Sequence, residues 1–383
     1  MPIADVGESR ILTLIDRISE LRQAGATVLP LHIGEPDFPT PSGIQEAAYR
    51  AMQAGLTHYS SPQGMHDLRQ AIAERVSSRF EVPAEAQDVI VLPAKLAIYA
   101  TILATLNPGD EVVLPEPTYL FEQPILLAGG RPVYVPTRAD HSLDLDAIAA
   151  ALTDRSRLLV LVSPANPTGR VLRRDELRAV VEIASDHGLT IASDETYSSM
   201  LYEGTHVAPA SLAPPEVPVV TIGSFSKSYA MTGWRAGYAV APPPIMHRLV
   251  SVVEHTVTCV PPFVQRACLW ALANAEADAD RFREQLRERR DHLLARLDDL
   301  PGVSYVQPQG ALYVFPKYEV NLSSVEFATR LLDEEHVAIV PGVAFGPHGE
   351  GHVRLSFTSP LDVLDEAMVR LGRFLEAKGA ARG

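Results

Sequence analysis

The sequence predicts an α/β fold, with a large domain built on a mostly parallel seven-stranded sheet and a smaller α+β domain. Two observations support this prediction. Short runs rich in Val, Ile and Leu alternate with helical segments of about ten to fifteen residues, which is typical of a parallel sheet covered on both faces. The 383 residues also exceed what one hydrophobic core usually contains, so two domains are expected.

The first part of the chain is expected to be a helix followed by a loop. Leu14 and Ile18 are spaced as on one face of a helix, and the Pro/Gly-rich stretch IGEPDFPTP (33–41) is typical of a loop. Apolar residues at helical spacing predict two further amphipathic helices, over 41–55 and 65–79.

Seven apolar runs in the middle of the chain are predicted to be the strands of the sheet. The last run follows its neighbour without an intervening helix, so it is expected to lie antiparallel. The runs are residues 89–92, 111–114, 131–135, 157–162, 189–193, 219–223 and 236–240.

After about residue 243 the chain becomes helical and highly charged, and shorter strands follow. We expect residues 1–40 to form an N-terminal segment that packs on the small domain. Residues 41–274 are expected to form the large domain with its linking helix, and residues 275–383 the small domain. The later elements are predicted as strands near 303–306, 311–315, 338–340 and 353–357 and a terminal helix over 361–377.

Composition excludes several classes of protein. With 46% hydrophobic and 21% charged residues, the chain is neither disordered nor fibrous. It carries 33 Lys and Arg against 47 Asp and Glu, a net charge of −14, and has no basic stripe. Because nucleic-acid binding relies on basic residues that contact phosphates, no nucleic-acid partner is expected.

Cysteine and histidine usage predicts neither a disulfide framework nor a metal site. Cys259 and Cys268 fit neither arrangement. The twelve histidines include one His-x3-His pair, His348 and His352, which lies in the Gly-rich segment GPHGEGH (346–352) that we interpret as a turn. The chain has no run of 18 apolar residues, and its first ten residues do not resemble a signal peptide. We therefore expect a cytoplasmic protein that acts on small molecules, with no membrane contact.

Polar residues follow three of the predicted strands at the point where each strand ends. Asn166 follows run 157–162, Asp194 follows run 189–193, and Lys227 follows run 219–223. Taken alone, each of these residues has a common structural explanation, because an Asp at a strand end often caps a helix and Asn-Pro-x-Gly often forms a turn. Ligands of open α/β sheets bind at the carboxyl ends of the strands, so together these residues predict a binding site.

The combination of residue types suggests a specific chemistry. A lysine amine can form a Schiff base with an aldehyde, and Lys227 is one of only four lysines. If the aldehyde is pyridoxal phosphate, its ring nitrogen needs a carboxylate, and its phosphate needs hydroxyls, an arginine and a helix N-terminus. Ser224, Ser226 and Arg235 could supply the hydroxyls and the arginine, and a helix that begins near Lys95 could supply the N-terminus.

Several sequence blocks resemble the class I/II aminotransferases, which are fold-type I enzymes that use pyridoxal 5'-phosphate. The resemblance covers essentially the whole chain, and the Ser-x-Ser-Lys…Arg block is the most specific part of it. The blocks are HIGEPDFPTP (32–41), HYSSPQGMHDLRQAIA (58–73), NPGDEVVLPEPTY (107–119), NPTG (166–169), SDETY (193–197), GSFSKSYAMTGWRAGY (223–238) and HVRLSF (352–357).

The resemblance implies a role for each matching residue around the cofactor. Lys227 would carry the Schiff base, and Asp194 would pair with the pyridine nitrogen. Asn166 and Tyr197 would face the phenolic oxygen of the ring, and Tyr119 would stack on it.

The resemblance also implies a substrate site and a second subunit. Arg354 would grip the α-carboxylate of the substrate beside Asn166, and Gly34 would line that site. Tyr59 matches a tyrosine that reaches the phosphate of the neighbouring subunit, so a homodimer with shared active sites is implied. The substrates would be an amino acid and a 2-oxo acid.

Two departures from the family pattern stand out. Pro93 occupies the block that cups the phosphate and has no N–H, although Ala94 and Lys95 keep their amides and could still bind the phosphate. The helix expected over 96–106 has no basic residue where family members that prefer dicarboxylates often place one. A strong preference for aspartate is therefore not expected.

The sequence thus predicts an aminotransferase and leaves alternatives open. One alternative is another reaction on the same fold, such as elimination, cyclisation or decarboxylation-linked oxidative deamination, because one fold hosts many chemistries. The unusual residues Pro93, Leu96 and Glu122 favour this alternative. Another is a non-catalytic ligand sensor, against which the lack of a basic helix-turn-helix extension argues.

Overall fold

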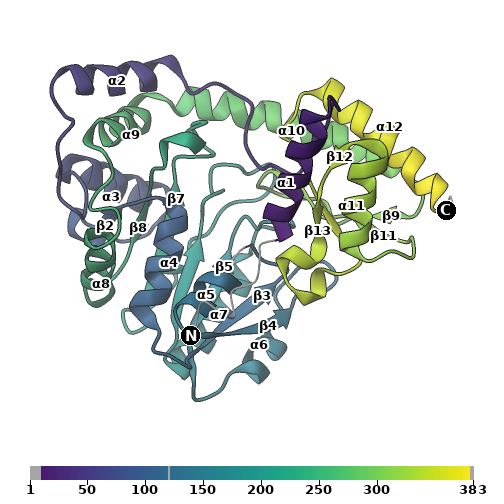
Figure 1. Ribbon diagram of the computed structural model, residues 1–383. Coiled ribbons are helices and arrows are strands. Elements are labelled where there is room, and N and C mark those ends of the chain that lie inside the picture. Colours follow the sequence, from purple (N-terminus) through teal and green to yellow (C-terminus); the bar gives the residue numbers. More distant parts are fainter. Residues whose placement is uncertain (1–9, 120, 380–383) are drawn as a thin grey trace.

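The computed structural model describes residues 10–119 and 121–379. Figure 1 shows two parts of the molecule. One part contains a large sheet with the helices that pack on it, and the other contains a smaller group of helices and short strands. The smaller group contains both the first described helix, α1 (Arg10–Gln23), and the last, α12 (Leu361–Ala377).

The seven predicted strands form one mixed sheet. They are β2 (Val89–Val91), β3 (Glu111–Glu116), β4 (Arg131–Pro136), β5 (Ser156–Val162), β6 (Thr190–Asp194), β7 (Val219–Ser224) and β8 (Gly237–Val240). Their order across the sheet is β2-β8-β7-β6-β5-β3-β4. Strands β3 to β7 pair in parallel, whereas β8 is antiparallel to both of its neighbours. The prediction of a largely parallel sheet with one antiparallel run is confirmed.

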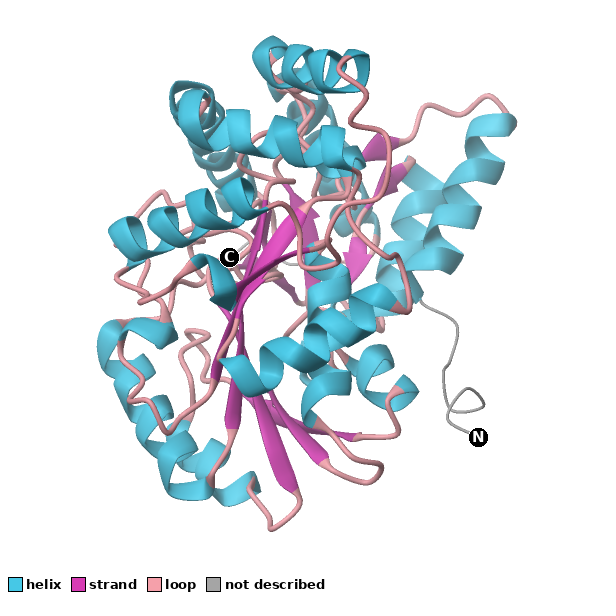
Figure 2. Ribbon diagram, turned by 90° about the vertical axis from the view of Figure 1, so that its left-hand side faces the viewer, coloured by secondary structure: helices cyan, strands magenta, loops and turns pink. Residues whose placement is uncertain are grey.

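Helices cover both faces of this sheet (Figure 2). Because side chains alternate along a strand, Val112 and Leu114 of β3 face one cluster of apolar side chains and Val113 faces another. The first cluster includes residues of α4 (Ala94–Thr105), α5 (Glu122–Leu127) and α8 (Pro243–Glu254), and the second includes residues of α6 (Leu145–Ala151) and α7 (Arg174–His187). This two-sided burial explains why the strands are continuously apolar.

Three more helices pack together beside β2. They are α2 (Ser42–Gln53), α3 (His66–Phe80) and α9 (Pro262–Asn274), of which α2 and α3 correspond to the helices predicted over 41–55 and 65–79. Ile44, Leu68 and Cys268 are buried in their shared cluster.

The long α10 (Glu276–Asp298) leads into the C-terminal elements. These are β9 (Val303–Ser304), β10 (Tyr313–Val314), β11 (Lys317–Tyr318), α11 (Ser324–Glu335), β12 (Val337–Ala338), β13 (Val340–Pro341), β14 (Val353–Ser356) and α12. Short 3-10 helices span Ala86–Asp88, Pro209–Ser211, Thr232–Trp234, Gly342–Phe345 and Pro347–Gly349. Within residues 10–119 and 121–379, no helix combines the length and the apolar character needed to cross a membrane.

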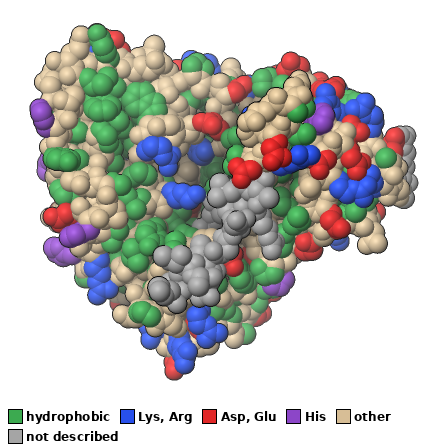
Figure 3. All heavy atoms as spheres, in the orientation of Figure 1, with side chains coloured by type: hydrophobic (Ala, Val, Ile, Leu, Met, Phe, Trp, Pro, Cys, Tyr) green, Lys and Arg blue, Asp and Glu red, His purple; other side chains and the backbone are tan. Residues whose placement is uncertain are grey.

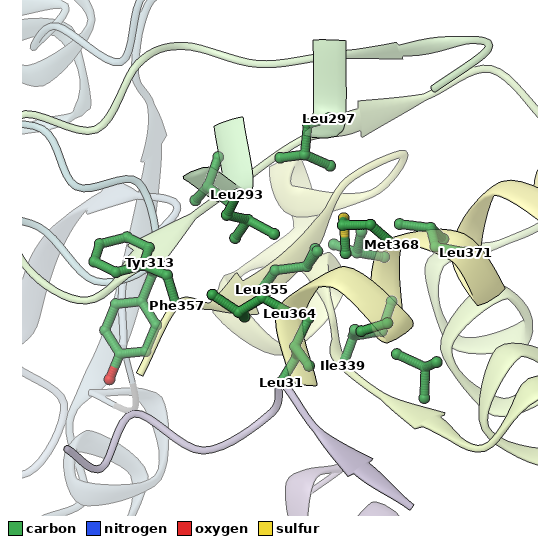
Figure 4. Close-up of a cluster of buried hydrophobic side chains, with 14 of the residues drawn as sticks. Leu31, Leu293, Leu297, Tyr313, Ile339, Leu355, Phe357, Leu364, Met368 and Leu371 are labelled. Carbon is green, nitrogen blue, oxygen red and sulfur yellow. The ribbon is translucent and has the colours of Figure 1, made fainter. Parts of the chain in front are cut away.

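The N-terminal segment contacts these C-terminal elements. Strand β1 (Leu29–Pro30) pairs in parallel with β12, and Leu31 is buried in the same apolar cluster as Leu355 and Leu364 (Figure 4). This pairing agrees with a segment that packs on the C-terminal part, although the domain boundaries at residues 41 and 275 stay a prediction.

The apolar cluster shown in Figure 4 extends to α11, where a matched pair of substitutions can test its contribution to stability. Leu331 is fully buried and Val325, on the same helix, is 42% exposed. Leu331→Ala leaves a cavity and should lower the free energy of unfolding by about 2–5 kcal/mol, whereas Val325→Ala should change it by about 0.5 kcal/mol or less. Denaturant titration followed by circular dichroism measures both, and equal effects would contradict the buried position of Leu331.

Candidate active site

The three polar segments that follow β5, β6 and β7 lie at one edge of the sheet. Asp194 at the end of β6 is in register with Val162 of β5 and with Ile222 of β7. The N–H of Ser163 donates a hydrogen bond to the Asp194 carbonyl oxygen at 3.1 Å. The segments that carry Asn166, Asp194 and Lys227 are far apart in the sequence, and the pairing of β5, β6 and β7 brings them together.

Asp194 is a buried carboxylate, with 8% of its surface exposed. Its Oδ1 accepts a hydrogen bond from the Thr196 N–H at 3.1 Å. Burial raises the pKa of Asp194, and the neighbouring Glu195 raises it further, whereas the bonds from Thr196 oppose this rise. A carboxyl whose pKa is raised on folding destabilises the fold as the pH rises above its unfolded pKa, unless a cation lies beside it. A protonated pyridine ring is such a cation, so Asp194 fits the cofactor.

The adjacent Glu195 is engaged in a different interaction. Its two carboxylate oxygens bond to the Ser193 hydroxyl at 2.8 Å and to His206 Nε2 at 2.7 Å, and all three residues are buried. Successive side chains on a strand point to opposite faces, which separates the two carboxylates. Glu195 therefore holds the end of β6, and Asp194 is left for a ligand.

Lys227 lies against the loop that carries Gly34. Its Nζ donates a hydrogen bond to the Gly34 carbonyl oxygen at 2.5 Å. A Cβ added at Gly34 would lie 1.7 Å from the hydroxyl oxygen of Tyr313, so only glycine fits there without a shift of the ring. The loop can approach Tyr313 because residue 34 has no side chain.

Arg354 on β14 is buried, with 4% of its surface exposed. Its two terminal nitrogens donate hydrogen bonds to Asn166 Oδ1 at 3.1 Å and to the His32 carbonyl oxygen at 2.6 Å. Its Nε has no partner among the described residues, and no Asp or Glu of that part of the chain pairs with the guanidinium. An unpaired buried charge costs several kcal/mol, on the order of the cost of losing a buried ion-pair partner. The site therefore suits a carboxylate ligand.

The His32 side chain does not add a second positive charge beside Arg354. Burial, together with the charges of Arg354 and Arg22, lowers the pKa of His32 to about 4. His32 is therefore neutral at physiological pH, and the positive charge of this pocket belongs to Arg354.

Aromatic rings surround the guanidinium. The Arg354 Cζ lies 4.3 Å from the ring centre of Tyr313 and 5.0 Å from that of Phe345. Tyr197 is buried, and its hydroxyl bonds to the Tyr313 hydroxyl at 2.8 Å. Burial raises the pKa of Tyr119. The nearby Tyr313 and Asp194 raise this pKa further, whereas Arg354 lowers it. Tyr119 therefore lies among the same charged groups.

The segments predicted to hold a phosphate meet around Gly237. Helix α4 begins at Ala94, and its first internal bond runs from the Ala97 N–H to the Pro93 carbonyl oxygen at 2.9 Å. The amides before Ala97 therefore have no partner within the helix and can bind an anion. A Cβ added at Gly237 would lie 3.0 Å from the Ala94 nitrogen, and Gly237 is in register with Ser224.

Three other residues of this group, Ser226, Arg235 and Lys95, are also located by the structure. The Ser226 N–H donates to the Ser224 hydroxyl at 3.1 Å. Arg235 lies two residues before β8, is exposed, and donates from a terminal nitrogen to the Thr232 carbonyl oxygen at 2.7 Å. Lys95 is exposed in the first turn of α4. The hydroxyls, the arginine and the helix N-terminus thus lie on segments that join at β7 and β8.

Tyr59 differs from the other predicted site residues. It lies between α2 and α3 and is 85% exposed. Within the described part of the chain, no hydrogen bond or ring contact connects it to the site of its own subunit.

Sequence reasoning missed Tyr313 and the pair formed by Glu116 and His348. Tyr313 is a hydroxyl-bearing residue within the apolar run ALYVF (311–315), which could have identified it. Glu116 is fully buried at the end of β3, and His348, in the Gly-rich segment GPHGEGH (346–352), pairs with its Oε1. Burial raises the pKa of Glu116, and His348 opposes this rise. The pair connects β3 to the C-terminal part beside Tyr119.

Comparisons with known proteins agree with this geometry. Residues 26–371 match the family model described as aminotransferase class I and II. The chain is 39% identical over 354 residues to the arginine–pyruvate transaminase of Pseudomonas aeruginosa, covering 91% of this chain and 90% of the relative. It is 36% identical over 382 residues to an aspartate aminotransferase of Pyrococcus abyssi, covering 97% of each. The solved alanine aminotransferase from Pyrococcus furiosus is 34% identical, with a TM-score of 0.94 over 98% of this chain and 99% of that one.

The matching fold, the family match over most of the chain and the residues at the sheet edge agree with one another. The chain belongs to the class I and II aminotransferase family, and it is a transferase that uses pyridoxal 5'-phosphate to move an α-amino group between an amino acid and a 2-oxo acid.

Proposed function

We propose that Arg354 binds the α-carboxylate of the substrate, with Asn166 and Gly34 beside it, and that Lys227 is the Schiff-base lysine and proton shuttle. One observation carries this proposal: the Arg354 guanidinium is buried without a carboxylate partner among the described residues. Its planar fork matches the two oxygens of a carboxylate, and a ligand carboxylate would offset the cost of burying the charge.

The cofactor is proposed to lie between Asp194 and the aromatic residues. When bound, pyridoxal 5'-phosphate supplies a protonated ring that withdraws electrons from the substrate Cα. Asp194 would keep the ring nitrogen protonated, because burial disfavours its carboxylate, as its raised pKa indicates, and a cation beside it removes this cost. Tyr197 and Asn166 would donate hydrogen bonds to the phenolic oxygen, and Tyr119 would stack on the ring.

The phosphate is proposed to bind at the start of α4. The amides of Ala94 and Lys95 have no intrahelical partner, and Ser224, Ser226 and Arg235 lie on the adjoining segments of β7 and β8. Pro93 lacks an N–H but occupies the position just before the helix, so it removes neither of the two amides.

Lys227 is proposed to hold the aldehyde of the cofactor and later to take a proton from the substrate Cα at its Nζ. A primary amine can do both, because it forms a Schiff base and, once released, acts as a general base. The carbonyl of Gly34 supports this role because it accepts a hydrogen bond from Nζ and so holds the amine at this edge of the sheet.

The active form is proposed to be a homodimer with shared active sites. The exposure of Tyr59 supports this proposal, since a tyrosine exposed to this degree is available to a second subunit. Tyr49 and Met52 on α2 are also exposed, and Figure 3 shows hydrophobic side chains gathered over that helix. Tyr59 would then contact the phosphate held by the partner.

The preferred amino donors are proposed to have neutral side chains. Lys95 is the one charged residue of α4, and the remainder of that helix is uncharged. A distal carboxylate would then lose hydration without gaining a partner there, which opposes binding. The relatives are named for arginine, aspartate and alanine, so their names do not select one donor for this chain.

Other assignments complete the proposal. The names of the relatives support transamination and give no support to elimination, cyclisation or oxidative deamination. A cytoplasmic location is proposed, in keeping with the free thiols of Cys259 and Cys268. Residues 1–40, 41–274 and 275–383 are proposed as the N-terminal segment, the large domain and the small domain.

Lys227→Ala should abolish the covalently bound chromophore, because Lys227 follows β7 and its Nζ lies against the Gly34 loop at this edge of the sheet. Borohydride reduction followed by peptide mapping should place the label on Lys227 in the wild-type protein. Lys317→Ala, at an exposed position, should leave the label in place. Label on Lys95, Lys317 or Lys378 would falsify the assignment.

Asp194→Asn should retain the cofactor but lose turnover by about a hundredfold or more, since an amide does not stabilise a protonated ring nitrogen. Bound cofactor is measured by absorbance, and turnover by steady-state kinetics with an amino donor and 2-oxoglutarate. Asp186→Asn, at an exposed position on α7, is the control and should behave as the wild type. Turnover close to wild type in Asp194→Asn would mean that another residue pairs with the ring.

A panel of amino donors at a fixed concentration of 2-oxoglutarate tests the substrate proposal. Leucine or phenylalanine should exceed aspartate in kcat/KM by about tenfold or more, which is about 1.4 kcal/mol in transition-state binding. Glutamate, ammonia and carbon dioxide should be measured separately, and glutamate should be the main nitrogen product. Aspartate as the best donor by tenfold would point to a basic residue elsewhere in the site.

A further inference from the structure

Two buried hydroxyls from distant parts of the chain meet beside the predicted cofactor site. Tyr197 follows β6 and Tyr313 lies on β10, and their hydroxyl oxygens are 2.8 Å apart. Both side chains are buried, with 6% and 3% of their surfaces exposed. In Figure 4, Tyr313 lies at the border of the apolar cluster, and its hydroxyl points away from the leucines.

The direction of this hydrogen bond follows from the number of protons. A phenol donates one hydrogen bond and accepts others through its oxygen. If Tyr197 donates its proton to the phenolic oxygen of the cofactor, it must accept the proton of Tyr313. Within the described residues, the Tyr197 hydroxyl has no other hydrogen-bond partner, so Tyr313 is its one donor from the protein.

We propose that Tyr313 is a positioning residue for the reaction, whose hydroxyl donates to Tyr197 and so directs the Tyr197 proton to the phenolic oxygen of the cofactor. The inference rests on the proposed function, because it requires Tyr197 to face that oxygen. A donor bond to Tyr197 polarises its hydroxyl and makes it a stronger donor in turn, as in other chains of hydrogen bonds.

The surroundings of the pair favour donation. Burial raises the pKa of Tyr197 well above its usual value, and Tyr313 and Tyr119 raise it further, while Arg354 lowers it. Tyr197 therefore keeps its proton at physiological pH and can donate it. Lys227 does not compete for this bond in the structure, because its Nζ donates to the Gly34 carbonyl instead.

The ring of Tyr313 has a separate task, which a substitution can preserve. Arg354 packs over the ring at 4.3 Å, and the ring also lies against Gly34. Tyr313→Phe keeps the ring and both contacts and removes only the hydroxyl. This variant therefore separates donation to Tyr197 from support of Arg354.

The chain offers a matched control for loss of a buried hydroxyl. Tyr202 belongs to the same apolar cluster, is 7% exposed, and donates to the Ala311 carbonyl oxygen at 2.7 Å, two residues from Tyr313. Tyr202→Phe removes a bond of similar length and burial that does not involve Tyr197. Tyr202→Phe should therefore lower the stability of the protein as much as the loss of a buried hydroxyl does in Tyr313→Phe, but it should not change the absorbance of the cofactor.

The experiment titrates the visible absorbance of each holoenzyme with pH and measures kcat and KM. A weaker hydrogen bond from Tyr197 would leave more electron density on the phenolic oxygen of the cofactor. The nitrogen that joins Lys227 to the cofactor would then keep its proton to higher pH. Tyr313→Phe should raise the midpoint of this absorbance titration by about half a pH unit. It should also lower kcat several-fold with little change in the KM for the amino acid, while Tyr202→Phe should match the wild type.

A double-mutant cycle shows whether Tyr313 acts through Tyr197. If it does, Tyr313→Phe should not move the midpoint further once Tyr197→Phe is present. An unmoved midpoint in Tyr313→Phe, or a shift that persists in the Tyr197→Phe background, would overturn this inference and leave the proposed function standing. A wild-type protein without a bound chromophore would overturn both.

Discussion

The buried guanidinium of Arg354 depends on three distant parts of the chain at once. Asn166 comes from the edge of the large sheet, His32 from the N-terminal segment, and Arg354 itself from β14. Each hydrogen bond satisfies part of a charge that has no carboxylate partner among the described residues. The geometry of the carboxylate site is therefore set by the docking of these parts, and a shift of any one of them would leave a buried donor unpaired.

The site contains a second uncompensated charge, of the opposite sign. Asp194 is buried with the Thr196 amide as its donor, whereas the adjacent Glu195 is bound to Ser193 and His206. Two neighbouring carboxylates thus have different tasks. Asp194 ends β6, and Glu195, the residue after the strand, lies with Ser193 on the other side of the chain. A negative group suited to a cationic ring and a positive group suited to a carboxylate lie at one edge of the sheet, which matches the charges of the cofactor and of an amino acid.

Much of the fold and part of the site could be predicted from the sequence. The seven strands and the antiparallel β8 follow from apolar runs that are buried on both faces. The convergence of Asn166, Asp194 and Lys227 follows from the rule that parallel strands end at one edge. The roles expected of Tyr119 and Tyr59 come only from the family resemblance, because nothing in their local sequence sets them apart.

Contacts between residues far apart in the sequence could not be predicted in this way. Tyr197 and Tyr313 are 116 positions apart, and Glu116 and His348 are 232 positions apart. Periodicity reports which face of an element is buried, but not which residue of another element it meets. The effect of Pro93, by contrast, depends on local sequence alone. Ala94 and Lys95 are expected to keep their amides, and α4 begins at Ala94, which leaves the amides of its first turn free of internal bonds.

The pairing of β1 with β12 also constrains when the protein can become active. Leu29 is in register with Val337, and Arg354 bonds to a carbonyl 322 positions earlier in the chain. A ribosome releases residues 29–34 long before their partners exist, so the large sheet can form while this segment is still unpaired. Such distant contacts are slow to close. Completion of the buried pocket around Arg354 is therefore a late event of folding, and a chain truncated within α11 would lack Arg354 altogether.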